Sequence, residues 1–166
     1  MILDQIPDFY KKYTVLFSDH TNAWAWLRKN ALYHFIKQLS EEKLNTPYSQ
    51  GKWTPVQVVR HVNDSERVLQ FRALWIARGS SEPQPGFDQD LWAKNYPLSI
   101  DKSLLEKLLQ ELLIIRQSSI LLFESFTEKD LLKTGVANNI LLSVGVLMYV
   151  IAGHEKHHYM LLKKYC

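Results

Sequence analysis

The sequence predicts an all-α fold, a four-helix bundle with short extra helices. In four long stretches, apolar residues recur every three or four positions, which is the spacing of one helix face. Capping residues precede these stretches, short links join them, and no run reads convincingly as a strand. A chain of 166 residues suits one domain, residues 1–166, that buries about two-thirds of its unfolded surface. Four long helices with short links form a bundle.

The first elements in chain order are a lead-in helix and a long helix. Residues 6–17 read as a short amphipathic helix with Pro7 near its first turn. Residues 19–22 supply capping side chains for the first long helix, expected over residues 23–39 with an apolar stripe on one face. A cap at residues 40–43 then opens one further turn.

The second long helix has a clear start signal. Thr54, Pro55 and Gln57 stand at the N-cap, N1 and N3 positions and together predict a capping box. The helix is expected to run from Pro55 to about Arg78. Breaker residues at 79–86 end it, and they lead into a loop or short turn rich in acidic and aromatic residues.

The second half of the chain repeats this organisation. The third long helix is expected over residues 101–126, and residues 127–130 cap a one-turn helix. Residues 135–139 turn the chain. Ser143 then caps the fourth long helix, which ends near Lys164 and includes most of an apolar run at residues 139–152.

Composition and charge exclude several classes of partner. Lysine and arginine exceed the acids by only 20 − 17 = 3 and are dispersed among them, so no nucleic-acid partner is expected. The single Cys166 allows no internal disulfide and fits a reducing compartment. The first residues lack a signal-peptide pattern, and the run 139–152 is shorter than the roughly 20 residues that span a bilayer. We therefore expect a cytoplasmic protein with no membrane partner.

Three histidines are placed where they can meet. His154 and His158 lie one helical turn apart on the same face, with their Cβ atoms about 5–6 Å apart. His61 lies about two turns after the Thr54 cap, on or beside the apolar stripe of the second helix. Bundles build metal centres from side chains on facing helices, and three protein ligands leave a position for water or substrate. The pattern predicts one divalent transition metal at these histidines, although imidazoles alone suit zinc, nickel, copper or iron.

Several segments resemble a known family. Residues 51–55, GKWTP, and residues 61–67, HVNDSER, resemble the second-helix signature of the DinB-like (DinB/YfiT) superfamily of metalloenzymes. Residues 151–158, IAGHEKHH, resemble its closing motif, and residues 85–90 and 6–10 are similar to one branch of it. The resemblance covers nearly the whole chain. It implies a DinB/YfiT-like four-helix bundle, a divalent metal that is often zinc or nickel, and a homodimer.

The resemblance also implies an activity. Characterised relatives include S-transferases that use bacillithiol and a mycothiol-dependent isomerase. We therefore expect a metal-dependent S-transferase that uses a low-molecular-weight thiol cosubstrate on small electrophiles. Two alternatives stay open: a metal-dependent hydrolase of small substrates, and a non-catalytic metal-binding stress-response dimer.

Residues 154–158 also spell H-E-x-x-H, the zincin signature, in which the glutamate is the general base of a metalloprotease. Only eight residues follow, so the downstream ligand common in zincins has no place. A simpler hydrolase is the better interpretation, with Glu155 or Asp64 as catalytic residues that assist a bound water. For Asp64, a solvated helix face paired with Arg67 is an equally good interpretation.

Three more side chains are predicted to bind substrate. Arg72 and Arg116 lie near core stripes and are expected to line a polar cavity that grips an anionic molecule, although their apolar stems can equally pack while the charge reaches solvent. His157 lies about 60° from the ligand face and is expected at the rim of the site.

Overall fold

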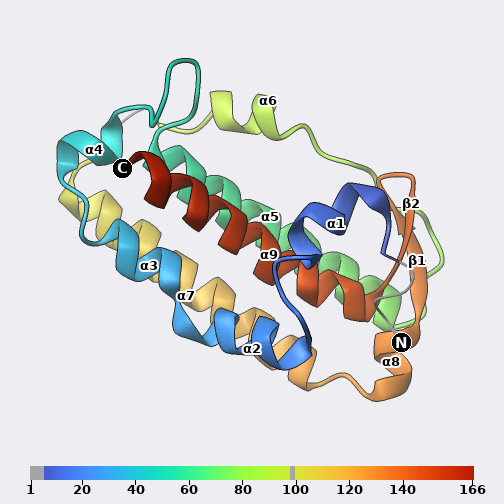
Figure 1. Cartoon of the computed structure of the whole chain (residues 1–166). Coiled ribbons are helices and arrows are strands. Elements are labelled where there is room, and N and C mark those ends of the chain that lie inside the picture. The colour runs from blue at the N-terminus through green and yellow to red at the C-terminus, as the bar shows by residue number, and fades with distance from the viewer. Residues whose placement is uncertain (1–5, 98–99) are drawn as a thin grey trace.

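The computed structural model describes residues 6–97 and 100–166, and this part of the chain forms the predicted four-helix bundle (Figure 1). Its long elements are α5 (Pro55–Ala77), α7 (Lys102–Glu124) and α9 (Val144–Tyr165), with α2 (His20–Lys29) and α3 (Ala31–Ile36) together making the fourth. The segment without a signal-peptide pattern includes residues 1–5, which lie outside the described residues. No helix in the described ranges is long and apolar enough to cross a bilayer.

The first long helix is broken, which the sequence did not predict. Asn30 has φ 48° and ψ 42°, in the left-handed region, and it separates α2 from α3. Asparagine tolerates this conformation better than most residues because its short side chain bonds locally. The break also frees backbone groups, and the Leu32 N–H lies 3.4 Å from Oε1 of Glu155 on α9.

The predicted capping box of α5 is confirmed. The Gln57 N–H donates to Thr54 Oγ1 at 3.2 Å, and the Thr54 N–H donates to Gln57 Oε1 at 2.9 Å. Ser143 caps α9 in the predicted place, where its Oγ accepts from the Val146 N–H. The short helices are α1 (Asp8–Thr14), α4 (Glu41–Asn45), α6 (Gln89–Lys94) and α8 (Glu128–Leu132).

A small antiparallel hairpin occupies a segment where the sequence predicted no strand. Strands β1 (Thr134–Ala137) and β2 (Ile140–Ser143) are joined by Asn138 and Asn139, with φ of 53° and 60°. Two consecutive positive φ values are what a two-residue hairpin turn of this hand requires, and asparagine suits both positions. The run 139–152 is therefore a strand followed by a helix. The hairpin meets the loop after α5 at Gln84, whose N–H donates to the Val136 carbonyl of β1 and whose carbonyl accepts from the Asn138 N–H of the turn.

A layer of buried polar side chains separates two apolar clusters among the described residues. Arg116 on α7 donates from Nε and NH2 to the Glu66 carboxylate of α5 at 3.0 and 2.8 Å, and it forms an ion pair with Glu155 of α9. Ser119 Oγ donates to Glu66 Oε1 at 2.6 Å. Because a buried charge without its partner is strongly destabilising, this layer fixes how α5, α7 and α9 sit against one another.

Candidate metal centre

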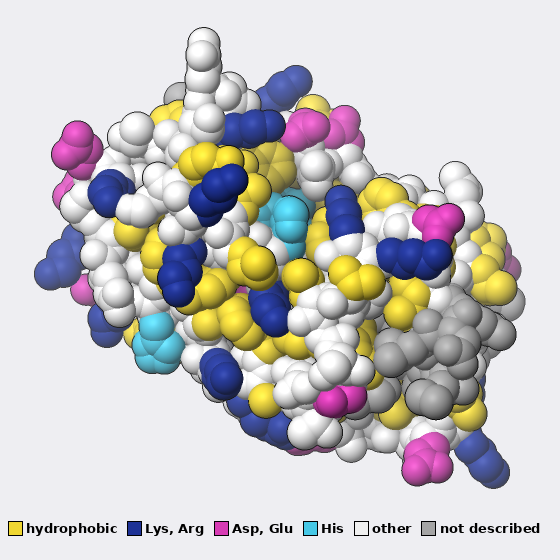
Figure 2. Space-filling model, viewed as in Figure 1, with side chains coloured by type: hydrophobic (Ala, Val, Ile, Leu, Met, Phe, Trp, Pro, Cys, Tyr) yellow, Lys and Arg dark blue, Asp and Glu magenta, His cyan; other side chains and the backbone are white. Residues whose placement is uncertain are grey.

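A cavity of about 340 Å³ opens between α5, α9 and α1, which lies across them (Figures 1 and 2). Figure 2 shows histidine side chains within a hollow that is bordered by hydrophobic and basic side chains. The described residues that line the cavity include Lys12 and Arg72 but no aspartate or glutamate. The cavity therefore has a positive and largely aromatic wall, which suits a small anionic or neutral molecule.

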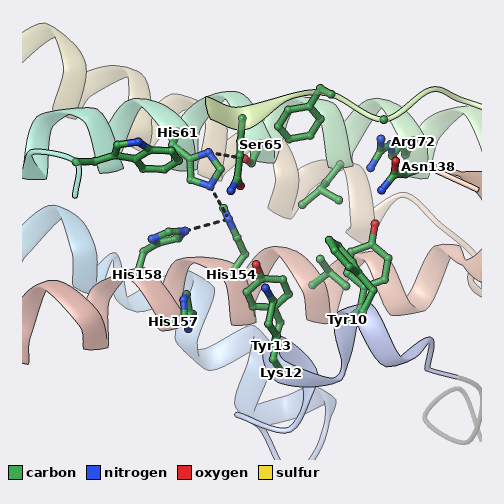
Figure 3. A pocket seen from close by; sticks show the side chains of 17 residues that line it. Tyr10, Lys12, Tyr13, His61, Ser65, Arg72, Asn138, His154, His157 and His158 are labelled. Atoms are coloured by element: carbon green, nitrogen blue, oxygen red, sulfur yellow. Dashed lines mark hydrogen bonds between the residues drawn. The ribbon is translucent and has the colours of Figure 1, made fainter. Parts of the chain in front are cut away.

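His61, His154 and His158 meet at one end of this cavity (Figure 3). His154 Nε2 lies 2.9 Å from His61 Nε2 and 3.2 Å from His158 Nε2. The possible ligand atoms of these residues all lie within 4.8 Å of one another. The predicted convergence of residues remote in the sequence is therefore what the structure shows.

Local sequence explains the placement. Facing helices α5 and α9 carry the histidines, and the i,i+4 spacing stacks His154 below His158 on one face of α9. Gly153 allows the covering helix to come close, because a Cβ at this position would overlap the Tyr13 carbonyl oxygen of α1. Tyr13 then packs edge-on to the His154 ring, with 5.3 Å between ring centroids.

Protons cannot satisfy this cluster, whereas a metal ion can. His154 Nε2 contacts the Nε2 atoms of both His61 and His158. Each Nε2 atom carries either a hydrogen or a lone pair, so a hydrogen on His154 Nε2 can be donated to only one of these two neighbours. Two imidazole nitrogens each about 2.0–2.1 Å from one ion lie about 2.8–3.4 Å apart, with the shorter separations in octahedral geometry and the longer ones in tetrahedral geometry. The observed separations of 2.9 and 3.2 Å match that spacing. The donor set therefore fits a divalent transition metal.

Burial keeps the ligand imidazoles neutral. Desolvation lowers the pKa of His61 to about 4. The pKa values of His154 and His158 also lie well below the ordinary histidine value, first through burial and then through the neighbouring histidines and Lys12. Neutral imidazole is the form that offers a lone pair to a metal, so these groups need no deprotonation at neutral pH.

Neighbouring side chains orient one of the imidazoles. Ser65 Oγ lies 3.4 Å from Nδ1 of His61, one turn along α5, so this nitrogen can donate while Nε2 faces the cluster. The Trp53 ring packs on His61 with 4.9 Å between centroids. His158 Nδ1 is buried and has no hydrogen-bond partner among the described residues.

Two predicted cavity residues line the cavity as expected. His157 stands on the α9 wall beside Tyr13, with 5.7 Å between ring centroids, and its pKa is lowered by burial and by Lys12. Arg72 stands on the α5 wall, away from the histidines (Figure 3).

Arg116 and Glu155 belong instead to the buried polar layer of the bundle. Arg116 is 2% exposed and does not line the histidine cavity, because Glu66 and Glu155 hold its guanidinium between the helices. Glu155 is 1% exposed and is turned about 100° from His154 around α9. It therefore lies away from the cavity face on which the sequence placed it beside a metal-bound water.

Asp64 also lies away from the cavity. Its carboxylate accepts a hydrogen bond from the Tyr96 hydroxyl at 2.8 Å and pairs with Arg67 at 3.4 Å. This is the arrangement of a partly solvated helix face, which was the alternative interpretation of Asp64 from the sequence.

The sequence interpretation missed the residues that α1 and the hairpin bring to the cavity. Tyr10, Lys12 and Tyr13 cover it from α1, and Asn138 closes its far end. The i,i+3 pair of tyrosines on the lead-in helix was the available signal. Periodicity assigns such residues to one face but does not say which helix that face meets.

Fold and site together define a helical-bundle protein with a candidate three-histidine metal centre. The family model of the DinB superfamily matches residues 23–162, a range that contains all of these histidines. The chain belongs to the DinB superfamily, as its motifs indicated.

Relatives and a solved structure agree with this placement. A protein of Geobacillus kaustophilus is 35% identical over 130 residues, covering 74% of this chain and 69% of its own. Another, from Geobacillus thermodenitrificans, is 34% identical over 139 residues, covering 78% and 72%. Both are named as candidate metal-dependent hydrolases. YfiT from Bacillus subtilis, described as a probable metal-dependent hydrolase with an unusual four-helix bundle topology, superimposes with a TM-score of 0.72 at 18% identity, covering 90% of this chain and 88% of YfiT. At that identity the likeness shows the fold alone.

Proposed function

We propose that this protein is a divalent-metal-dependent enzyme that transfers a low-molecular-weight thiol to small electrophiles. The observation that carries the proposal is the meeting of the His61, His154 and His158 imidazoles in the wall of a small-molecule cavity whose described lining includes no carboxylate. Zinc or nickel suits the donor set.

The lining favours a thiol over water as the group to be activated. A divalent ion held by the histidines lowers the pKa of a thiol or water bound to it. A thiol with an ordinary pKa of about 8.5 needs a much smaller shift than water at about 15.7. The cavity offers His157, whose lowered pKa keeps it neutral, as a proton acceptor, but no described carboxylate. A thiol, which loses its proton more readily than water, therefore suits this cavity better than water does.

Hydrolysis of small substrates is the second candidate, and the names of the relatives favour it. In that case His157 would accept the proton of the attacking water. A non-catalytic metal-binding stress-response dimer remains the third.

A cytoplasmic homodimer belongs to the same proposal. The single Cys166 supports a reducing compartment. Ile114 and Leu121, one above the other on α7 and about 60% exposed, support a second apolar stripe that a second copy would cover. Light scattering coupled to gel filtration tests the dimer, and a measured mass of 19.5 kDa, that of a single chain, would contradict it.

The experiment has a metal step and a turnover step. Elemental analysis of the protein is compared with a variant in which His61, His154 and His158 are alanine, and with His34→Ala as an exposed control. We expect about one metal per chain in the wild type and the control, and none in the triple variant. Unchanged stoichiometry in the triple variant rules out the site.

Turnover is then screened with the metal-loaded protein. Thiols paired with electrophiles are compared with esters and amides in water, before and after chelation. Thiol transfer that is lost with the metal supports the proposal, whereas metal-dependent hydrolysis without a thiol favours the second candidate. A folded, metal-loaded protein that turns over neither class supports the non-catalytic dimer.

A further inference from the structure

We propose that the end of the cavity opposite the histidines is a carboxylate-binding subsite built around Arg72. The ligand would be an elongated small molecule, with an anionic group held at Arg72, an uncharged middle and its reactive thiol at the histidines. This inference rests on the proposed function and names the class of its thiol substrate.

Arg72 is a buried cation without an anionic partner in the part of the chain that the structure describes. It is 3% exposed and stands on the cavity wall, and its NH2 group donates to the Pro85 carbonyl at 2.8 Å. No ion pair to a carboxylate is found for it among residues 6–97 and 100–166, whereas the equally buried Arg116 is held by Glu66 and Glu155. Buried charges are costly unless paired, so Arg72 has charge available for an anionic ligand.

Further hydrogen-bonding groups surround the guanidinium. Figure 3 shows the Tyr10 hydroxyl and the Asn138 side chain directed toward the same end of the cavity as Arg72. Asn138 is fixed there, because its N–H donates to the Gln84 carbonyl at 2.9 Å and its side chain packs against Gly86, where a Cβ would overlap it. A planar guanidinium flanked by hydroxyl and amide donors is the donor set that suits a carboxylate.

The spacing along α5 gives the length of the ligand. His61 and Arg72 are 72 − 61 = 11 residues apart, which is about 20° past three full turns, so both face the cavity at a separation of about 16 Å along the axis. The arginine side chain leans back toward the helix N-terminus and shortens this gap. Leu69 and Val150 also line the cavity, and they give it an apolar wall that suits the uncharged middle of the ligand. A ligand that reaches both ends spans on the order of 10 Å.

The test uses straight-chain thiols on the cobalt-loaded protein, because thiolate binding to cobalt produces a charge-transfer absorption. Carboxylates of the series 3-mercaptopropionate, 6-mercaptohexanoate and 8-mercaptooctanoate are each compared with the mercapto-alcohol of equal length. We expect the carboxylate to bind at least about tenfold more tightly than the alcohol at the best chain length. The advantage should be small for the shortest thiol, which cannot span the cavity.

Substitutions assign this advantage to the subsite. Arg72→Met should abolish the preference for carboxylate and leave mercapto-alcohol binding unchanged, while Arg28→Met, an exposed arginine elsewhere, should change neither. Tyr10→Phe removes only a hydroxyl and should reduce the preference a few-fold. Tyr10→Phe also keeps the test decisive if Arg72→Met does not fold, as circular dichroism will show.

A second arm separates this inference from the proposed function. Binding of octanoate and octanol to the metal-free protein is measured by calorimetry in the same variants. Arg72-dependent octanoate binding without any thiol–cobalt absorption band would support the subsite and contradict the proposed thiol transfer. Strong thiol–cobalt bands with no preference for carboxylates would overturn the subsite and leave the proposed function standing.

Discussion

Acidification should destabilise the metal-free protein through its buried histidines, and His61 provides the magnitude. Its pKa is about 4 in the folded protein against an ordinary value of 6.5. Between these pH values the unfolded chain binds a proton that the folded protein refuses, so stability falls as the pH falls through this window. The shift of 6.5 − 4 = 2.5 units corresponds to about 3.4 kcal/mol at about 1.36 kcal/mol per unit. That is a large part of the 5–15 kcal/mol typical of a domain.

Urea unfolding at several pH values between 7.5 and 4.5 measures this effect. Other acid-sensitive groups also contribute, so the quantity of interest is the difference in pH dependence between the wild type and His61→Gln. We expect the variant to lose about 2.5 kcal/mol of the pH-dependent destabilisation over this range, while His34→Gln, an exposed control, keeps it all. Equal pH dependence in the wild type and His61→Gln would refute the reasoning.

Metal bound at the histidines should offset this loss of stability. An ion that binds only the folded protein stabilises it by about 4 kcal/mol at a thousandfold excess over its dissociation constant. Because the folded protein keeps its imidazoles neutral down to the pKa of about 4 of His61, this gain should persist at pH 5.5 and fade only near and below pH 4. A metal-induced stabilisation that has largely vanished at pH 5.5, where exposed histidines take up protons, would mean that the ion binds elsewhere.

The remaining predictions concern backbone fit and the buried polar layer. Gly153→Ala should lower the free energy of unfolding by about 1–3 kcal/mol in urea and speed proteolysis of α1, because the added methyl meets the Tyr13 carbonyl. Glu155→Gln should lower the free energy of unfolding by up to about 3 kcal/mol and keep the full metal content, because it weakens the Arg116 ion pair without changing the cavity. Loss of turnover with unchanged stability would instead indicate that Glu155 acts in catalysis. Asn30→Ala should cost about 1–2 kcal/mol in thermal or urea unfolding, whereas Asn30→Gly should not.

The long helices and their starts were predictable because local signals specify them. The Thr54 capping box and the Ser143 cap are interactions within four residues, and both occur as the sequence indicated. The break at Asn30 was not predictable in the same way, because the apolar stripe continues on both sides of it. The hairpin was missed because Asn138-Asn139 opens an apolar run whose early part fits a strand or a helix equally well.

The meeting of the three histidines was predictable because their positions along α5 and α9 already show which face of each helix they occupy. The far end of the cavity was not, because Tyr10 and Asn138 come from elements whose docking depends on tertiary contacts. One such contact is the close approach of α1 to Gly153. Arg72 and Arg116 show the same limit: both lie near core stripes, but only the structure shows that Arg116 is the one paired with carboxylates of the described residues.

The H-E-x-x-H pattern illustrates how one helix serves two environments. His154 and His158 share a face that lines the cavity, while Glu155, about 100° away, lies inside the bundle against Arg116. A glutamate held there by a buried guanidinium does not face a ligand in the cavity, which differs from the zincin arrangement, in which this glutamate is the general base. What turns the histidine pair into a candidate metal centre is His61 from another helix. The proposed chemistry would therefore draw on groups such as His157, Lys12 and Arg72 that share the cavity wall.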